Sequence, residues 1–397
     1  MKMFVRKLFT ITLPLMLVAL VIVAVGAEVW IRATWDPRRG TPGFFLSDPV
    51  LIQRMAPFYD GWFAGVPVRT NNLGFRDQRD YAIEKSARTV RILVLGDSIT
   101  FGYGSVYEHT YPYLLKQQLG EWRPDVDWQV WNTGVPGYST SQELAYLQRV
   151  GPQFDPDLVI VGFSMNDVMG NVRREQPGPA QRVASAVKNF VKPRLYSYDL
   201  YRKIRYVAGE TLFRSQSSLA YLAALANEQA TFAVPDATIS EEQQLTYPDA
   251  ITDPQLTTCD AAVPTPTGVA VARTSVASVD DQGWLSAVSE FQQLNRSGTY
   301  RVIFFVNAAP NQCQKPDRFY DGDMKLINDI FVNRLSEGGT LVVSSYEEFK
   351  KYRPSQMPMA NWHSLGNTNW VKASLLFDVV QGYLPARLPR LGRAVSP

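Results

Sequence analysis

The stretch that decides the fold is TVRILVLGDSITFGYG, residues 89–104. Its first half is a short, nearly continuous apolar run, rich in β-branched residues and closed by Gly96, which is typical of a buried strand in a parallel sheet. Ser98 follows on the turn into the next segment. Because ligands bind outside the carboxyl ends of strands in open α/β sheets, this position favours a nucleophilic serine. The alternative is that Asp97 or Ser98 only caps the following helix.

Helical and strand patterns alternate along the rest of the chain. This alternation predicts βαβ units, and therefore a mainly parallel, doubly wound sheet with helices on both faces, a three-layer α/β sandwich of flavodoxin-like type. The predicted helices lie at residues 111–122, 139–151, 284–295, 324–339 and 367–384, and the further strands at 127–134, 156–164, 300–310 and 340–346.

The N-terminal segment predicts a membrane span. Residues 8–27 carry no charge, and twenty such residues suffice to cross about 30 Å of hydrocarbon as a helix. A long signal sequence is the alternative, with Val25-Gly26-Ala27 as a weak cleavage site, but its apolar stretch is usually shorter. We therefore expect a retained single-pass anchor in the inner (cytoplasmic) membrane. The basic residues on its two sides nearly balance, and we expect the short N-terminal flank in the cytoplasm and the large domain on the exported, periplasmic or extracellular, side.

Composition shifts along the chain predict its organisation. The segment after the anchor is expected to be an irregular lead-in that contains RTNNLGFRD at 69–77, and the later insertion to be partly helical, with an Ala/Leu helix near 218–229. Within the insertion, the basic aromatic stretch 187–206 predicts an amphipathic helix that packs on the domain, or alternatively lies on a membrane surface. The expected parts are 1–30, a cytoplasmic stub and anchor; 31–88, the lead-in; 89–170 and 282–385, the sheet domain; 171–281, the insertion; and 386–397, a tail.

Composition also excludes several classes of function. A formal charge of +3 without long basic runs gives no footprint for nucleic acid. Cys259 and Cys313 are far apart in sequence, so they suggest neither a zinc nor a redox motif, and they form either one disulfide or two unpaired thiols. With two histidines in the chain, we expect no metal site. The GYG at 102–104 lacks a Walker lysine, and we expect no cofactor.

Polar residues follow three further strands. Gly137, in NTGVPGYST, and Asn166, in SMNDV, supply a backbone N–H and a side-chain amide of the kind that stabilises an oxyanion. Taken singly, Gly137 is equally a turn residue and Asn166 a helix cap. His363, in MANWHSLG after the last strand, is a candidate general base, the alternative being an ordinary loop histidine. The joint occurrence of these residues favours the catalytic interpretation.

This set of residues resembles the SGNH (GDSL-like) hydrolase superfamily of esterases and acylhydrolases. The likeness covers roughly residues 69–170 and 283–384 and excludes the insertion. It implies the SGNH fold, Ser98 as nucleophile and His363 as general base, with an oxyanion hole formed by the backbone N–H groups of Ser98 and Gly137 and the amide of Asn166. The matching blocks are Gly96-Asp97-Ser98, Asn132 to Gly137, Asn166-Asp167 and His363.

Two positions depart from the family pattern. Ser164 stands where the third block usually has glycine, and Ala360 stands three residues before His363, where an aspartate would orient the imidazole. A well-studied protease loses about 10⁴ in rate when this acid is neutralised. We expect either a Ser-His dyad or a triad with an acid from elsewhere. The candidates after the fourth and fifth strands are Asp317, Asp321, Asp323, Glu347 and Glu348.

These features predict a membrane-anchored, exported serine esterase. It would remove acyl groups, acetyl among them, from a carbohydrate or another ester through an acyl-enzyme. Three alternatives stay open: an acyltransferase acting on a cell-envelope glycan, a hydrolase of lipid esters or thioesters, and a non-catalytic glycan-binding protein on a degenerate hydrolase scaffold. The expected partners are a small-molecule or glycan ester and, through the N-terminal helix, the membrane.

Overall fold

The structure is a computed structural model. It describes residues 8–168, 171, 177–201, 245–251, 281–313, 317–320, 322–360, 363–386 and 388. The predicted helix near 218–229, most of the insertion, Cys259 and nearly all of the tail lie outside these residues.

A five-stranded parallel sheet forms the centre of the molecule, in the order β11-β8-β7-β5-β6. The chain runs from β5 to the edge strand β6 and then returns to add β7 on the other side of β5, so the strand order reverses at β5. The carboxyl end of β5 is therefore a topological switch point, the place where open α/β sheets bind ligands. The strands are β5 (Thr89–Gly96), β6 (Asp127–Asn132), β7 (Leu158–Phe163), β8 (Val302–Val306) and β11 (Leu341–Ser344).

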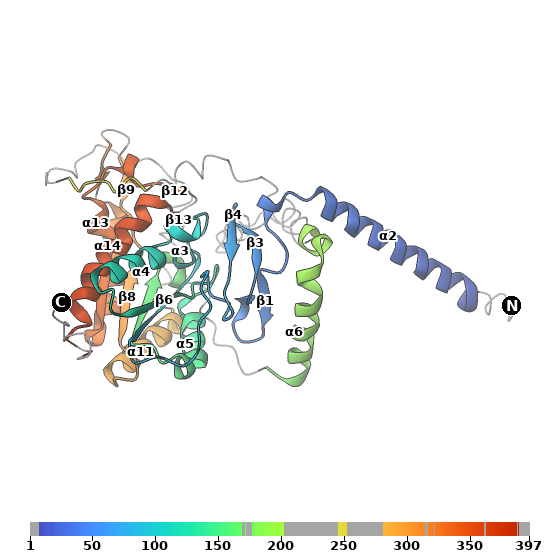
Figure 1. The fold of residues 1–397 in the computed structure, drawn as a ribbon, viewed down its shortest axis with the longest axis horizontal. Coiled ribbons are helices and arrows are strands. Elements are labelled where there is room, and N and C mark those ends of the chain that lie inside the picture. The colour runs from blue at the N-terminus through green and yellow to red at the C-terminus, as the bar shows by residue number, and fades with distance from the viewer. Residues whose placement is uncertain are drawn as a thin grey trace.

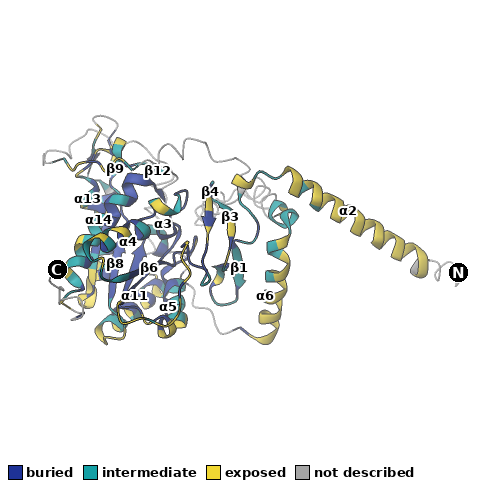
Figure 2. Ribbon diagram, in the orientation of Figure 1, coloured by how far each residue is buried: buried dark blue, intermediate teal, exposed yellow. Residues whose placement is uncertain are grey.

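Helices cover both faces of this sheet, so the predicted three-layer α/β fold is confirmed (Figure 1). On one face, α5 (Thr140–Phe154), α11 (Gln282–Arg296) and α12 (Asp323–Ser336) bury apolar side chains against the strands. On the other face, α4 (Tyr111–Trp122) and α14 (Gly366–Tyr383) do the same. The central strands are buried along their whole length (Figure 2), as their continuous apolar sequences predict.

The lead-in was expected to be irregular, and this prediction is wrong for residues 45–69. Two antiparallel hairpins occupy them, β1 (Phe45–Asp48) with β2 (Ile52–Met55) and β3 (Asp60–Phe63) with β4 (Val66–Arg69). The turn between β3 and β4 has positive φ at Ala64 and Gly65, as a two-residue hairpin requires, although Ala-Gly is not one of the common hairpin signals. Tertiary packing makes these short strands stable, because their apolar side chains form a cluster with Phe101, Val135 and Tyr138 of the sheet domain.

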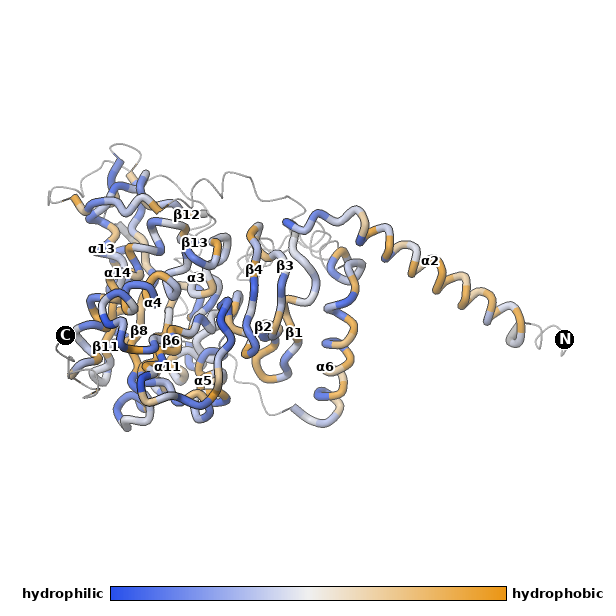
Figure 3. The backbone as a smooth tube through the Cα atoms, in the orientation of Figure 1, coloured by the Kyte–Doolittle hydropathy of each residue, from blue (hydrophilic) through white to orange (hydrophobic). Residues whose placement is uncertain are grey.

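The N-terminal helix α2 (Leu13–Thr34) projects away from the body of the protein (Figure 1). None of its residues is buried. Residues 10–34 are long and apolar enough, by length and composition, to cross a membrane, and an 18-residue window within them has a mean hydropathy of 2.5. Figure 3 shows hydrophobic residues along most of the length of this helix. Helix α6 (Pro179–Val191), which comes from the insertion, packs on β1 near the C-terminal end of α2.

Shorter elements complete the described part of the chain. Cys313 is buried and disulfide-bonded. The remaining elements are the single turns η1 (Leu8–Thr12), η2 (Pro37–Arg39), η3 (Tyr107–His109), η4 (Met165–Val168), η5 (Lys192–Arg194), η6 (Glu337–Gly339) and η7 (Pro354–Gln356), the helices α3 (Ser98–Phe101) and α13 (Tyr346–Phe349), and the strands β9 (Asn311–Gln312), β10 (Phe319–Tyr320), β12 (Met359–Ala360) and β13 (His363–Ser364).

Candidate active site

Ser98 is the first residue of α3, directly at the switch point of the sheet. Asp97 caps this short helix, because its Oδ1 accepts the N–H of Ile99 at 2.8 Å. Asp97 can therefore cap the helix while Ser98 serves as a nucleophile, so the two functions suggested for this turn are compatible. Ser98 itself is only 2% exposed.

Glycines at the ends of the three neighbouring strands make room for α3. A Cβ at Gly96 would lie 2.0 Å from Thr100 Oγ1, and one at Gly162 would lie 2.2 Å from the same atom. A Cβ at Gly134 would lie 2.5 Å from the backbone nitrogen of Phe101. Any larger residue at these positions would displace α3, so the glycines fix where Ser98 can sit.

The structure brings Ser98 and His363 together across 265 positions of sequence. His363 Nε2 lies 2.8 Å from Ser98 Oγ, and both side chains are buried. His363 belongs to β13, which pairs with β12 so that Ala360 lies directly opposite His363. The position three residues before the histidine is thus its cross-strand neighbour.

The strand that carries His363 is tied to the loop that follows α3. The carbonyl of Ser364 accepts hydrogen bonds from Ser105 Oγ at 3.1 Å and from Asn369 Nδ2 at 2.8 Å. Tyr103, in the same loop, stacks on the imidazole of His363 with ring centroids 4.6 Å apart and an interplanar angle of 29°. One loop therefore restrains both the backbone and the ring of the histidine segment.

Asn166 lies beside the serine turn but contacts Asp97 in this structure. Its Nδ2 donates to Asp97 Oδ2 at 2.9 Å. An amide nitrogen carries two hydrogens, so one N–H remains for a second acceptor. Asn166 is held by η4, immediately after β7, which places it at the same edge of the sheet as Ser98.

Gly137 lies in the loop that follows β6, also at this edge. The loop is anchored to the end of β5, because the N–H of Val135 donates to the carbonyl of Gly96 at 2.9 Å. Gly137 has a φ of +83°, which favours glycine, and the carbonyl of Pro136 accepts from Gln53 Nε2 at 2.8 Å. The hairpin residue Gln53 thus helps to hold the Gly137 loop.

Several buried titratable side chains lie near the turn that carries Ser98. Burial raises the pKa of Asp97, while its hydrogen bonds from Asn166 and Ile99 oppose that shift. Burial, together with the charge of Asp97, also holds the pKa of Glu143 well above its usual range. The pKa of Asp167 is also held well above its usual range, mainly by burial and then by the charge of Glu143. Lys372 on α14 is buried as well, and burial lowers its pKa to about 7 against the attraction of Asp97.

Three of the five candidate acids for His363 are engaged with other residues. Asp317 accepts hydrogen bonds from the backbone and hydroxyl of Ser355. Glu347 and Glu348, both in α13, pair with Lys350 and Lys351, which follow that helix. Asp321 and the side chain of Asp323 lie outside the described residues. In the part of the chain that the structure describes, no group of three or more His, Cys, Asp or Glu side chains is arranged to hold a metal ion.

The RTNNLGFRD stretch supplies a support that the sequence analysis did not assign. Arg76 is fully buried, and its guanidinium donates to the carbonyls of Phe101, Gly102 and Ser105. Burial lowers its pKa to about 9, so Arg76 is still charged at neutral pH. It therefore fixes the loop that carries Tyr103.

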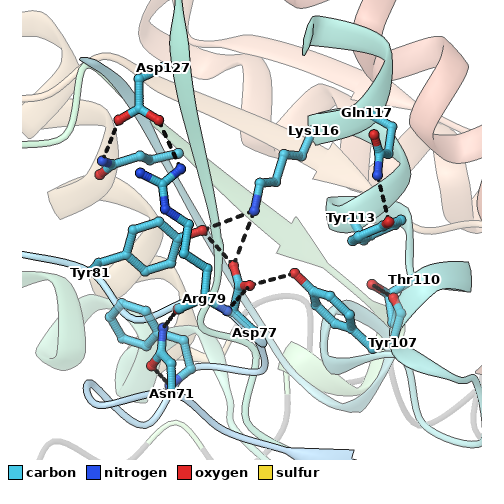
Figure 4. A network of polar contacts seen from close by, with 12 residues as sticks. Asn71, Asp77, Arg79, Tyr81, Tyr107, Thr110, Tyr113, Lys116, Gln117 and Asp127 are labelled. Carbon is cyan, nitrogen blue, oxygen red and sulfur yellow. Dashed lines mark hydrogen bonds and ion pairs between the residues drawn. The ribbon is translucent and has the colours of Figure 1, made fainter. Parts of the chain in front are cut away.

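Asp77, the next residue, is the centre of a second network (Figure 4). Its carboxylate accepts from Tyr81 at 2.6 Å and from Tyr107 at 2.7 Å, and lies 3.6 Å from Lys116 Nζ. Tyr107 belongs to the segment between α3 and α4, so the stretch holds both ends of this segment. The sequence signal was an Arg-Asp pair in an Asn/Gly-rich turn, which by itself does not reveal its distant partners.

Esterases and acylhydrolases are among the known proteins whose sequences resemble this chain. Residues 94–274 match the GDSL-like Lipase/Acylhydrolase family. An arylesterase from Vibrio mimicus is 38% identical over 82 residues, which are 21% of this chain and 40% of that protein. The chain therefore spans about 40% of the length of this curated relative.

Solved structures of two esterases and of an alpha/beta hydrolase resemble the chain only loosely. An alpha/beta hydrolase from the metagenome of Lake Arreo, Spain, has 14% identity and a TM-score of 0.37, covering 75% of this chain and 97% of that one. A two-domain esterase active on acetylated mannans has 12% identity and a TM-score of 0.36, covering 74% and 49%. A mutant acetylxylan esterase from Geobacillus stearothermophilus has 13% identity and a TM-score of 0.34, covering 75% and 95%. Similarity at this level carries no argument about the substrate.

Proposed function

We propose that the chain is a serine esterase that removes acyl groups, acetyl among them, from a carbohydrate or another ester through an acyl-enzyme on Ser98. The match of residues 94–274 to the GDSL-like Lipase/Acylhydrolase family supports this proposal. The observation that carries this proposal is the 2.8 Å contact between Ser98 Oγ and His363 Nε2. A nucleophile and a base within hydrogen-bond reach are what covalent ester hydrolysis requires.

In the first half-reaction, Ser98 Oγ attacks the ester carbonyl while His363 Nε2 takes the hydroxyl proton. The carbonyl oxygen becomes an oxyanion, for which the backbone N–H groups of Ser98 and Gly137 and the amide of Asn166 are the proposed donors. The tetrahedral intermediate then collapses, the bond to the leaving alcohol breaks, and His363 returns the proton to that alcohol. The acyl group is left on Ser98.

In the second half-reaction, water attacks the acyl carbonyl and His363 accepts one of its protons. A second tetrahedral intermediate collapses, the carboxylic acid leaves, and the proton returns to Ser98 Oγ. The enzyme is restored without any other co-reactant.

We propose that His363 works with Ser98 as a dyad. Ala360 occupies the position opposite His363, and the stack of Tyr103 on the imidazole supplies a restraint on its ring orientation. The Ser105 and Asn369 hydrogen bonds to Ser364 hold the backbone next to it. Packing thus takes over part of the orienting role that an acid has in a triad.

Hydrolysis of a short-chain aryl ester by the purified full chain tests the proposal. Aryl esters are the first choice because the Vibrio mimicus relative is an arylesterase. We expect Ser98→Ala to lower kcat by at least about 10³, whereas Ser297→Ala, at an exposed loop serine, leaves it unchanged. Undiminished hydrolysis by folded Ser98→Ala protein would refute the proposal. Labelling of Ser98 by a fluorophosphonate, lost in Ser98→Ala, gives a readout that does not depend on the choice of substrate.

We also propose that α2 is a retained membrane anchor and that the domain lies on the exported side. The length of α2 supports retention, because the apolar helix over residues 10–34 is longer than the apolar stretch of about 7–15 residues that is usual in a removed leader. The Glu28 carboxylate accepts the backbone N–H groups of Tyr196 and Ser197 at 2.9 Å each, and Arg32 donates to the carbonyl of Arg194 at 2.8 Å. Glu28 and Arg32 follow the weak cleavage site at Val25-Gly26-Ala27, so these contacts join the end of α2 to the domain in either case.

Mass spectrometry of the protein extracted from membranes tests this second proposal. We expect the mass to include residues 8–34, and we expect protease added outside spheroplasts to digest the domain. A mature mass that begins after Ala27 would show cleavage, and a protected domain would show the opposite orientation.

A further inference from the structure

Helix α6 presents its apolar side chains to the outside. Val183, Val187 and Phe190 are 64%, 57% and 66% exposed. With 3.6 residues per turn they lie on one face of the helix, which Val191 extends. Figure 3 shows hydrophobic and hydrophilic residues alternating along α6, as in an amphipathic helix. We call this set of four side chains the α6 stripe.

The opposite, polar face of α6 is the one that packs on the protein. Asn189 exchanges two hydrogen bonds with the backbone of Ser47 in β1, at 2.7 and 3.0 Å, and Lys192 Nζ donates to Ser47 Oγ at 3.0 Å. Ser185, one turn before Asn189, is half-buried on the same face. An amphipathic helix on a soluble domain normally buries its apolar face, so this arrangement is inverted.

The segment after α6 forms hydrogen bonds with the C-terminal part of α2. Tyr196 and Ser197 bind Glu28, Arg194 binds Arg32, and the ring of Tyr196 meets that of Trp35 in an edge-to-face contact with centroids 5.6 Å apart. Glu28 lies six residues before the end of α2, a rise of about 9 Å. The C-terminal end of α6 is therefore held where α2 leaves the hydrocarbon.

The charge of α6 suits a lipid surface. Residues 179–198 contain Arg182, Lys188, Lys192 and Arg194 and no acidic residue. Apolar side chains on one face and basic side chains beside them are typical of helices that lie in the interface of a bilayer with anionic headgroups. A partner protein would match the apolar stripe equally well, but the attachment to α2 places the stripe beside a bilayer.

We propose that α6 is an interfacial helix, whose α6 stripe inserts into the outer surface of the same bilayer that α2 spans. This second contact would fix the orientation of the domain, which a single spanning helix leaves free to rotate about its axis. The proposal rests on α2 being retained in the membrane.

Environment-sensitive fluorescence tests the interfacial position of α6. The full chain is reconstituted in nanodiscs that contain phosphatidylglycerol. A nitrobenzoxadiazole probe is attached without reductant at Phe190→Cys, with the unsubstituted chain as labelling background. The matched control is Leu326→Cys on α12, where the native side chain is 64% exposed against 66% for Phe190. A probe at Val21→Cys on α2 reports whether the anchor is in the bilayer.

We expect the emission of the probe at position 190 to shift to the blue and to be quenched by lipids with a spin label near the headgroup. The probe at 326 should behave as in water, and the probe at 21 should be quenched by deep labels. Water-like emission at 190 with a quenched probe at 21 would overturn the α6 proposal alone. An unquenched probe at 21 would overturn the anchor and this proposal together. A blue shift at 190 that lipid labels do not quench would show that the probe is buried against protein and not in the bilayer, and would overturn the α6 proposal.

Discussion

The side-chain amide of Asn166 donates to the carboxylate of Asp97, the residue immediately before Ser98, at 2.9 Å. Asn166 was predicted as an oxyanion donor, and the structure adds that its orientation is set by this bond. A single side chain thus links the segment after β7 to the turn that carries Ser98, and one of its two N–H groups is not used by this bond.

Replacing Asn166 should therefore impair the chemical step. We expect Asn166→Ala to lower kcat by about 10²–10³ with little change in KM, because an oxyanion donor acts in the transition state. The bond from Asn166 opposes the rise that burial causes in the pKa of Asp97. Because the Asp97 carboxylate caps the helix that begins with Ser98, we expect the variant also to lose activity at a higher pH on the acid side. The kcat–pH profile measures both effects, and an unchanged kcat would show that Asn166 only caps and supports the turn.

The stack of Tyr103 on His363 should matter through its ring. Tyr103→Leu removes the flat surface against the imidazole, and we expect kcat to fall about tenfold, which corresponds to roughly 1.4 kcal/mol. Tyr103→Phe keeps the ring and should retain most of kcat. Equal losses in both variants would assign the effect to the hydroxyl instead of the stack. Labelling of Ser98 by fluorophosphonate should slow in parallel with kcat in Tyr103→Leu.

His363 should behave as one unit with Ser98. We expect His363→Ala to lower kcat by about 10³ or more, and the double variant with Ser98→Ala to lose little beyond either single variant. The second histidine of the chain provides the control, because His109→Asn in η3 should keep full activity. Multiplicative losses in the double variant would show that the two residues act independently.

Glu143 should make stability depend on pH. Its pKa is raised in the folded state by burial and by Asp97, so the folded protein binds more protons than the unfolded chain above about pH 4. The free energy of unfolding should therefore fall as pH rises from that point to the raised pKa, by up to about 1.4 kcal/mol per pH unit for one group. Below about pH 4 the contribution is fully present.

The variant Glu143→Gln removes this titration while keeping the shape of the side chain. Denaturant unfolding at several pH values should give a flatter curve for it and greater stability than the unsubstituted protein at alkaline pH. Glu121→Gln, at an exposed position on α4, is the control and should leave the curve unchanged. A Glu143→Gln curve parallel to that of the unsubstituted protein would contradict the prediction.

Much of the fold was predictable because its signals are local. The run from Thr89 to Gly96 became β5 with the same bounds, and residues 111–122 became α4. Strand and helix periods, and the glycines at strand ends, report burial and backbone conformation within a few residues. The hairpins of the lead-in escaped prediction because their strands are four residues long and depend on packing against Phe101 and Val135.

The sequence by itself determined the α/β sheet, the serine turn at the end of its first strand, and the family likeness that picked out His363. Only the tertiary structure decided which distant groups meet: Ser98 with His363, Tyr103 with the same imidazole, Asn166 with Asp97, and the polar face of α6 with β1. The physical reason is that periodicity shows which side of an element can be buried, whereas contacts between elements depend on strand order and on how loops pack across the sheet edge. An α6 that buries its polar face is the clearest case, since its sequence alone favours the opposite arrangement.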